Sequence, residues 1–462
     1  MPDRLVIESV ETESGDSKNF ACNGGAMKEI KVGLLGFGTI GAGVVRVFQQ
    51  NAQVMADRLG ASMKLARIAD LDITTDRGVQ VEEGVLTTDA DQVLTAPDID
   101  VVIELIGGYE PARSFVLKAI ENGKHVVTAN KALLAKYGEE ILGAAAAKGV
   151  EVMFEASVGG GIPVLSAIKE NLCVNNFRSI FGILNGTCNY ILTRMTDEGA
   201  DFASVLKDAQ EQGYAEADPT FDIEGVDTAH KLAILIALCY GTKVDFDDIH
   251  LEGISQISAV DIQFARQFGY KIKLLAIGKE VDGEIEARVH PTMIPENAPL
   301  ADVDGVFNAV RLVGDFVGPV MLYGQGAGMD ATASAVMGDV MAIARNQLTD
   351  AVGRAPAMGY CPEAIGKLPI RAMADIVSRY YLRFRTVDQP GVLASISSIL
   401  GKYQIGIASM IQPEGQAADT VPIVIMTHDA KEADIRSALD EIDQLEVVRE
   451  PSHFIRIENS IE

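Results

Sequence analysis

Two charged residues four positions apart are the first pair in this sequence that could carry out chemistry. Asp227 and Lys231 lie in the segment GYAEADPTFDIEGVDTAHK, which leads into the apolar stretch 232–240. Residues four apart share one face of a helix, and an apolar helix disfavours the charged form of a lysine, so that its neutral amine becomes accessible. Such a pair can accept and donate a proton in a reaction. The alternative is an ordinary surface ion pair, which helices commonly carry.

A glycine loop is the second chemical feature. GFGTIG at 36–41 matches G-x-G-x-x-G, and its residues are Gly36, Phe37, Gly38, Thr39, Ile40 and Gly41. The first glycine permits a tight turn, the second lets a pyrophosphate approach the backbone, and the third lets helix and strand pack closely. Free N–H groups at the helix N-terminus then face the phosphates. The loop predicts dinucleotide binding, and the alternative is a glycine turn that binds nothing.

The elements around this loop alternate between strand and helix. We expect strands at 29–36, 64–69, 101–105, 125–128 and 150–155, and helices at 42–59, 111–122 and 138–148. Strands that recur between helices indicate a parallel sheet covered on both faces. The sequence therefore predicts an α/β protein whose first domain, 28–156, is a Rossmann fold.

Two further domains are expected after the first. Glycine and proline are dense at 159–163, and we place an α+β domain at 157–372, with the chain returning to the cofactor domain near 323–345. Residues 378–460 show the order strand, helix, strand, strand, helix, strand. That order predicts a ferredoxin-like sandwich.

The end of the second strand bears on the choice of cofactor. An acidic side chain there accepts the ribose 2′-OH of NAD, whereas a basic one meets the 2′-phosphate of NADP. The strand ends ARIADLD, so Asp70 or Asp72 could bind the hydroxyl, while Arg67 could reach a phosphate or lie on the outer face. We expect NAD, with NADP as the alternative. Lys131 follows the fourth strand at the carboxyl edge, where such sheets bind ligands, and would otherwise be a solvated loop lysine.

Composition narrows the classes of ligand and location. Acidic residues outnumber basic ones by 65 to 39 among 462 residues, giving a formal net charge of −26, which disfavours nucleic acids and anionic membranes as partners. No apolar run is long enough for a membrane span, and the five cysteines form no C-x-x-C pair. We expect a soluble cytoplasmic protein without structural zinc. Residues 1–27 lack the regions of a signal peptide and are expected to be a disordered tail, with Met27 as an alternative start.

Several strings of the sequence together resemble one enzyme family. VVTANKALLA at 126–135, EASVGGGIPVL at 155–165 and ILNGTCNYIL at 183–192, with the glycine loop and the segment around Lys231, resemble homoserine dehydrogenases. The block at 378–460, with DQPGVLASIS at 388–397, resembles an ACT domain. The resemblance implies reversible NAD(P)-linked oxidation of L-homoserine to L-aspartate 4-semialdehyde, on the path to threonine, methionine and isoleucine. It also implies that 157–372 binds substrate and forms a dimer.

The resemblance assigns roles to individual residues. Lys231 is the implied proton donor, and Lys131 is implied to lie beside the nicotinamide and the reacting carbon. The implied substrate residues are Gly213, Tyr214, Glu216, Asp222 and Asp227. Further implied cofactor residues are Ile106, Gly107, Thr128, Ala129, Asn130, Gly326 and Gly328. Asp218 and Asp222 could instead cap a helix, and we expect His230, about 100° around the helix from Lys231, to be a packing residue.

An ion site and an effector site also follow from the resemblance. The residues that match a site for a sodium-like monovalent cation are Glu155, Val158, Gly160 and Ile162. One carboxylate and several backbone carbonyls would supply hard oxygen ligands, and the alternative is a glycine turn between domains. The residues that match the amino-acid site of ACT domains are Asp388, Gln389, Gly391, Val392 and Leu393. Threonine is the expected effector, unless the module only dimerises, and we expect a homodimer or homotetramer because such sites form across paired modules.

Two other functions are compatible with a dinucleotide-binding fold. Another Rossmann oxidoreductase, acting on a related amino acid or aldehyde, should lack the combination of Glu216, Asp227 and Lys231. A non-catalytic protein that senses amino acids should lack a catalytic lysine. Lys131 and Lys231 are both present, which favours the enzyme.

Overall fold

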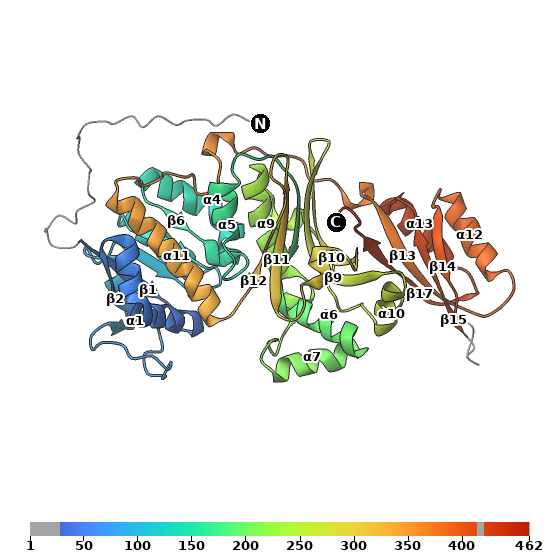
Figure 1. Ribbon diagram of the computed structural model, residues 1–462, viewed down its shortest axis with the longest axis horizontal. Helices are drawn as coiled ribbons and strands as arrows, with labels where there is room; N and C mark the ends of the chain where they lie inside the picture. Colours follow the sequence, from blue (N-terminus) through green and yellow to red (C-terminus); the bar gives the residue numbers. More distant parts are fainter. Residues whose placement is uncertain (1–27, 414–419, 462) are drawn as a thin grey trace, which may run out of the picture.

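The structure is a computed structural model that describes residues 28–413 and 420–461. The predicted disordered tail 1–27 lies outside the described residues. Three domains follow one another along the long axis of the molecule, with the N-terminal domain at one end and the C-terminal domain at the other (Figure 1).

The N-terminal domain is built on six parallel strands in the order β3-β2-β1-β4-β5-β6. Strand β1 lies inside the sheet and pairs in parallel with both β2 and β4. The buried apolar side chains of the sheet divide between two clusters, so both faces are covered, which confirms the predicted Rossmann-like fold. The strands are β1 (Glu29–Leu35), β2 (Ser62–Ala69), β3 (Leu86–Thr87), β4 (Val101–Glu104), β5 (His125–Thr128) and β6 (Val152–Met153).

Helices from distant parts of the chain cover this sheet. Helices α3 (Ala112–Glu121) and α4 (Lys131–Lys148) contribute to the cluster on one face, while α1 (Thr39–Leu59) and α11 (Met329–Leu348) cover the other. The prediction that α4 starts at residue 138 was wrong. Asn130 caps α4 by accepting the N–H of Leu133 at 3.1 Å, and the glycine at 138 lies inside the helix instead of at its start. A short helix, α2 (Asp91–Leu94), precedes β4.

The central domain carries the strand order β12-β11-β7-β9-β10, in which neighbours are antiparallel. Helix α9 (Val226–Tyr240) is buried along most of its length and shares an apolar cluster with strand residues such as Ile180, Ala276 and Val289. The strands are β7 (Phe177–Ile183), β8 (His250–Leu251), β9 (Tyr270–Val281), β10 (Glu284–Pro295), β11 (Phe307–Gly314) and β12 (Gly318–Gln325). The other helices are α5 (Val164–Ser166), α6 (Gly186–Glu198), α7 (Phe202–Glu211), α8 (Thr220–Ile223) and α10 (Ala259–Gln267).

The C-terminal domain has the predicted ferredoxin-like order of strands and helices. Its main strands lie in the order β17-β13-β15-β14, and the apolar sides of both helices pack against them. The elements are β13 (Val377–Thr386), α12 (Val392–Lys402), β14 (Ile407–Ile411), β15 (Val421–Thr427), β16 (Ala430–Lys431), α13 (Glu432–Ile442) and β17 (Val448–Ile457). Helix α13 starts at Glu432, directly after 430–431, which form a short strand on β13.

The central and C-terminal sheets are joined into one. Strand β17 pairs in parallel with β10, at Thr292 with Arg456 and at Met293 with Ile457. Backbone hydrogen bonds therefore link the two domains directly. None of the helices in the described part of the chain is long and apolar enough to cross a membrane.

The crossing of α1 and α11 gives a test of the fold. A Cβ on Gly43 would lie 2.8 Å from the side chain of Met329 and 3.0 Å from its carbonyl oxygen, so Gly43→Ala should lower Tm. Gly143, inside α4, has no atom within 4 Å of such a Cβ, so Gly143→Ala should raise Tm by favouring the helix. We expect opposite effects of about 1 kcal/mol each in thermal unfolding. A Gly43→Ala variant as stable as the wild type would contradict the close crossing.

Candidate active site

A buried carboxylate joins two lysines from different domains. Asp227 and Lys231, on α9, form an ion pair at 2.6 Å, and Lys131, the first residue of α4, approaches the other oxygen of Asp227 at 3.1 Å. Asp227 is 5% exposed and Lys231 is 9% exposed. The pair is therefore not the surface ion pair that the sequence left open, and it lies at the junction of the N-terminal and central domains.

Local backbone structure fixes each partner. Gly225 precedes α9 with φ +81°, a left-handed conformation that favours glycine and turns the chain sharply from α8 into α9. Asp227 then lies in the first turn of α9, where the helix dipole favours a negative charge. Lys131 is held by the Asn130 cap, whose side-chain amide also donates to the carbonyl of Gly108 at 2.7 Å.

The electrostatics of this group keep Asp227 ionised. Burial alone would raise the pKa of Asp227, but the charges of Lys231 and Lys131 and the hydrogen bonds to its carboxylate hold that pKa well below its ordinary value. The Lys231 ammonium also donates to the carbonyl oxygen of Leu184 at 2.7 Å. The Lys231 ammonium thus has two acceptors in its buried position. The arrangement can hold a proton on Lys231 and deliver it to a nearby oxygen.

Asn185 is a site residue that the sequence reasoning missed. Its amide donates to Asp222 at 2.8 Å and to Asp227 at 3.0 Å, so it ties the two carboxylates together. The hydroxyl of Thr187 lies 3.1 Å from Asp222 and 2.7 Å from the carbonyl of Tyr214. Both residues belong to ILNGTCNYIL, a string that contributed to the resemblance without any of its residues being assigned to the site.

Three other predicted substrate residues lie on a loop outside the group formed by Lys131, Asp227 and Lys231. Gly213, Tyr214 and Glu216 are on an exposed loop after α7, where Tyr214 packs on Tyr190 with ring centroids 4.9 Å apart. The structure does not bring the side chain of Glu216 into contact with the lysines or with Asp227. Asp218 caps its own turn by accepting the N–H of Thr220 at 3.1 Å.

His230 stacks between two aromatic rings. Its ring centroid is 5.7 Å from that of Phe221 and 4.5 Å from that of Phe246. Burial lowers the pKa of His230, aided by the charge of Lys131. These contacts confirm that His230 is a packing residue.

Each glycine of the loop meets a different structural requirement. Gly36 has φ +96°, and a Cβ there would lie 2.7 Å from the carbonyl oxygen of Leu105. A Cβ on Gly41 would lie 2.3 Å from the carbonyl oxygen of Gly36, whereas one on Gly38 would meet nothing within 4 Å. Turn, close packing and open space thus occur at the predicted positions, and the space beside Gly38 at the start of α1 fits a pyrophosphate.

The carboxyl edge of the sheet is organised by a second residue that the sequence reasoning missed. The fully buried Glu104 ends β4 and accepts the N–H groups of Ile106 at 2.8 Å and Gly107 at 3.0 Å, together with the hydroxyl of Thr128 at 2.6 Å. Thr128 in turn accepts the N–H of Asn130 at 2.9 Å. The predicted cofactor residues after β4 and β5, including Ala129, are thereby held as one connected edge.

At the end of β2, Asp70 is better placed than Arg67 to contact the ribose of a bound cofactor. The Asp70 carboxylate accepts the N–H of Phe37 in the glycine loop and that of Asp72. Arg67 is exposed, donates to the carbonyl of Ala66 at 2.7 Å, and acts electrostatically on Asp98, in the segment leading into β4. Asp70 therefore lies against the loop, whereas Arg67 faces the opposite end of the strand.

The glycine turns that link the domains lie against each other. A Cβ on Gly160 would be 2.5 Å from the backbone of Gly326, and Gly161 donates to the carbonyl of Gln325 at 3.1 Å. Gly328 has φ +105° and precedes α11. The predicted cation residues Val158, Gly160 and Ile162 thus surround the crossing of two chain segments, one of which continues into α11.

Glu155 lies beneath this crossing and is 6% exposed. Its carboxylate accepts the N–H groups of Leu165 and Ser166, each at 2.7 Å, and burial raises its pKa. Burial, aided by the charge of Glu155, raises the pKa of the neighbouring Asp339 to about 7. Within residues 28–413 and 420–461, no group of three or more His, Cys, Asp or Glu side chains could hold a metal ion. A site made of one carboxylate and backbone carbonyls would not be such a group.

The predicted effector residues form the turn between β13 and α12. Asp388, Gln389 and Gly391 are exposed, and Gly391 caps α12 with φ +93°. Val392 is buried and Leu393 packs against the core of the domain, so the turn is anchored from within. Exposed N–H groups at such a helix start can meet a carboxylate.

Three family models match most of the described chain. Residues 36–155 match the NAD binding domain of homoserine dehydrogenase, and residues 163–341 match the homoserine dehydrogenase model itself. Residues 380–447 match the ACT domain. The first matched region contains Lys131 and the second contains Asp227 and Lys231, so these three residues lie where the two regions contact each other.

Similar proteins extend over nearly the whole chain. Homoserine dehydrogenases of Neisseria gonorrhoeae and Pseudomonas aeruginosa are each 45% identical, over 94% of this chain and 99% of their own length. The crystal structure of a homoserine dehydrogenase from Thiobacillus denitrificans has a TM-score of 0.88 at 46% identity and covers 94% of this chain and 99% of its own. These matches indicate that the protein uses a nicotinamide cofactor and contains an ACT domain. This chain belongs to the homoserine dehydrogenase family.

Proposed function

We propose that Lys231, Asp227 and Lys131 carry the reversible oxidation of L-homoserine to L-aspartate 4-semialdehyde in a cytoplasmic enzyme. The observation that carries this assignment is the single buried carboxylate shared by a lysine from each of two domains, at 2.6 and 3.1 Å. Lys131 begins a helix at the carboxyl edge of the parallel sheet, where nicotinamide rings bind. Lys231 belongs to the central domain, so the substrate lies between the two.

The proton follows a short path. When bound, the nicotinamide supplies the hydride acceptor for oxidation and the hydride donor for reduction. In the direction of reduction, the Lys231 ammonium donates its proton to the aldehyde oxygen, and in oxidation the neutral amine accepts the hydroxyl proton. Asp227 remains ionised throughout and stabilises the charged form of Lys231. Lys131 adds a second positive charge that stabilises negative charge developing on the reacting oxygen.

The polar end of the substrate faces acidic groups. Asp222 is half-buried and is oriented by Asn185 and Thr187, so its carboxylate can accept N–H bonds from the substrate ammonium. The backbone of Tyr214 already lies beside Asp222, because the hydroxyl of Thr187 contacts both. Glu216, further along the same exposed loop, would meet the substrate only if the loop moves toward Asp222 when substrate binds. The substrate class that fits is a small α-amino acid with a hydroxyl on its side chain.

Lys231→Met tests the proton donor. We expect kcat with homoserine to fall by about 10²- to 10⁴-fold, while fluorescence titration shows unchanged binding of the nicotinamide cofactor. Lys207→Met is the matched control, because Lys207 forms an i,i+4 ion pair with Glu211 on the exposed side of α7. That variant should keep wild-type kcat. Retention of wild-type kcat by Lys231→Met would overturn the assignment.

Cofactor choice is proposed to rest on Asp70, with NAD preferred over NADP. Asp70→Asn retains an oxygen that can accept the N–H of Phe37 but removes the charge that opposes a 2′-phosphate. We expect kcat/KM for NADP relative to NAD to rise about tenfold, equivalent to ~1.4 kcal/mol. Asp72→Asn is the control, since Asp72 accepts N–H groups from Thr74 and Thr75 in its own loop. A larger change in Asp72→Asn would assign the ribose to Asp72 instead.

A monovalent cation is proposed to bind beside Glu155, with carbonyls of Val158, Gly160 and Ile162 as further ligands. The support is the buried carboxylate of Glu155, whose pKa burial raises, beside the half-buried Asp339, which accepts the N–H of Glu155 at 2.8 Å. A cation would stabilise the ionised forms of both carboxylates. The ion would fix the crossing of the two glycine turns. Sodium or potassium chloride should then raise Tm above that in tetramethylammonium chloride of equal ionic strength, and Glu155→Gln should abolish the difference.

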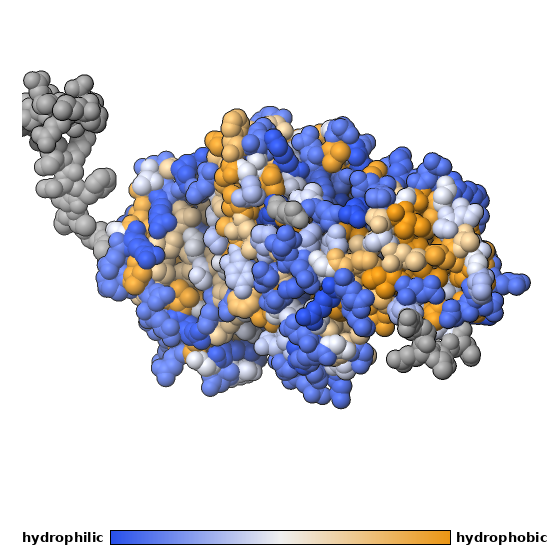
Figure 2. Space-filling view, turned by 45° about the vertical axis from the view of Figure 1, so that its right-hand side comes forward, coloured by the Kyte–Doolittle hydropathy of each residue, from blue (hydrophilic) through white to orange (hydrophobic). Residues whose placement is uncertain are grey.

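Threonine is proposed as the effector of the ACT domain, in a homodimer or homotetramer. The exposed start of α12 suits the carboxylate of an amino acid. Strand β14 is the last of its sheet and exposes Ile407 and Met410, and Figure 2 shows apolar surface gathered over this end of the molecule. An open apolar edge favours pairing with a second copy. Threonine that changed neither activity nor oligomeric state, in an assay combined with sedimentation, would refute this regulation.

A further inference from the structure

A bidentate ion pair connects the ACT domain to a short segment of the central domain. Arg456, at the end of β17, donates to the two carboxylate oxygens of Glu252 at 2.7 and 2.9 Å. Arg456 is 1% exposed and is also held by Glu432 of α13 through its Nε, at 2.8 Å. Arg436, on α13, reaches the same Glu252 at 3.2 Å. The carboxylate of Glu252 is therefore held from the ACT domain, while His250 of the central domain lies 2.9 Å from it.

The segment that contains Glu252 packs directly on the turn between α8 and α9. Ile254 donates its N–H to the carbonyl of Ile223 at 2.8 Å. Gly253 lies so close that a Cβ would be 2.5 Å from that same carbonyl oxygen and 2.6 Å from the Cα of Glu224. On the other side, a Cβ on Gly225 would come within 3.0 Å of Leu251. A shift of 251–254 must therefore move the turn with it.

That turn carries the proposed substrate carboxylates at its two ends. Asp222 lies in α8 immediately before it, and Asp227 lies in the first turn of α9 immediately after it. Asn185 bridges the two carboxylates at 2.8 and 3.0 Å. The distance and orientation between them thus depend on the conformation of 223–225.

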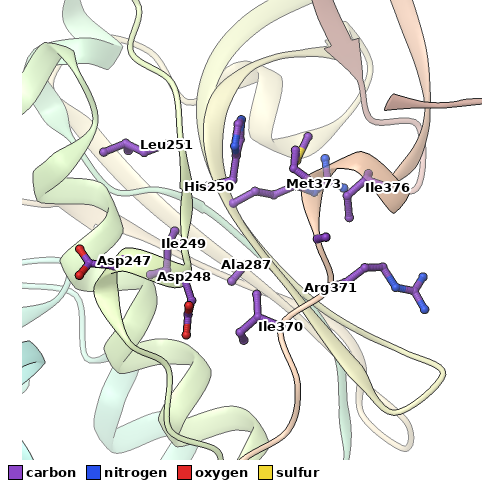
Figure 3. A pocket seen from close by; sticks show the side chains of 12 residues that line it. Asp247, Asp248, Ile249, His250, Leu251, Ala287, Ile370, Arg371, Met373 and Ile376 are labelled. Atoms are coloured by element: carbon purple, nitrogen blue, oxygen red, sulfur yellow. The ribbon is translucent and has the colours of Figure 1, made fainter. Parts of the chain in front are cut away.

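The segment has little other support on its outer side. A cavity of about 460 Å³ lies beside β8, between it and the chain segment 370–376, and His250 and Leu251 contribute to its lining (Figure 3). Strand β8 is two residues long and pairs only with β10 among the strands of the described chain. Backbone pairing with β10, including the N–H of Glu252 donated to Val289 at 2.8 Å, and the ion pair with Arg456 together determine where the segment lies.

We propose that Glu252 is a positioning residue through which the ACT domain sets the geometry of Asp222 and Asp227, and hence the affinity for the amino-acid substrate. The inference rests on the proposed roles of those two carboxylates. What would change between states is not the reaction itself but the position of Asp222, the proposed partner of the substrate ammonium, relative to Asp227 and its two lysines. Movement of β17 or α13 in response to an effector would then alter substrate binding before it altered the chemical step.

The structure provides a matched control at the same domain junction. Asp261 of α10 binds Arg383 of β13 with distances of 2.7 and 3.1 Å, so it is also a bidentate pair between the two domains. Asp261 is fully buried and also accepts the hydroxyl of Tyr381 at 3.0 Å. Helix α10 carries none of the proposed site residues. Loss of this pair should loosen domain docking without affecting the α8–α9 turn.

The test compares Glu252→Gln with Asp261→Asn in the full-length enzyme. For Glu252→Gln, we expect the KM for homoserine to rise by roughly five- to tenfold, with the KM for the nicotinamide cofactor unchanged and kcat largely retained. Asp261→Asn should lower Tm at least as much but keep the wild-type KM for homoserine. Arg456→Gln should raise the KM as Glu252→Gln does, and the double variant should be no worse than either single one.

Hydrogen exchange supplies a readout that does not need turnover. Amides in 223–231 should exchange faster in Glu252→Gln than in the wild type, and at the wild-type rate in Asp261→Asn. Equal KM changes in the two variants, or a Glu252→Gln variant with lowered Tm and wild-type KM and exchange, would overturn the proposal. A wild-type enzyme without homoserine turnover would refute the proposed function instead, and the exchange experiment would still decide the role of Glu252.

Discussion

The constraint on which the active site depends is the sharing of one buried negative charge by two lysines. Asp227 compensates Lys231 within its own helix and Lys131 across the domain junction. Burying an ammonium without a partner is costly, so Lys231 depends on the ionised carboxylate, whereas the partly exposed Lys131 is attracted to it across the junction. The low pKa of Asp227 follows from the same arrangement, since each added positive charge stabilises the ionised form. The two domains are thus held together at the site by the same groups to which we assign the chemistry.

A second level of organisation is the merging of the central and ACT sheets. The ACT domain is fixed by backbone pairing of β10 with β17 and by three sets of ion pairs, in which Glu252, Asp261 and Glu458 are the acidic partners. The bidentate pairs Arg456–Glu252 and Arg383–Asp261 specify one geometry more strongly than a flexible linker would. The domain is therefore built as an extension of the catalytic domain, and small shifts within it can be transmitted without a hinge.

The sequence was sufficient to predict features whose determining residues lie close together along the chain. The glycine loop with its flanking strand and helix, and the spacing of Asp227 and Lys231, are contained within short windows, and the structure shows the expected local geometry at both. Asn185 and Glu104 were missed because their roles arise from contacts made only after folding. The pair Arg456–Glu252 joins residues 204 positions apart, so no local sequence pattern predicts it. The start of α4 was misplaced because an internal glycine was taken for a boundary, although Asn130 supplied the cap.

The return of α11 to the first domain has a consequence for how the chain folds as it is synthesised. Residues of α11, including Ala333, Val336 and Val340, complete the apolar cluster on one face of the N-terminal sheet. A ribosome releases this helix only after nearly all of the central domain has emerged. The dinucleotide-binding domain therefore cannot close its core as an independent first unit, and its exposed sheet face must wait, or be protected by a chaperone, until residues 329–348 arrive. Domain order along the chain and order of folding are consequently different in this protein.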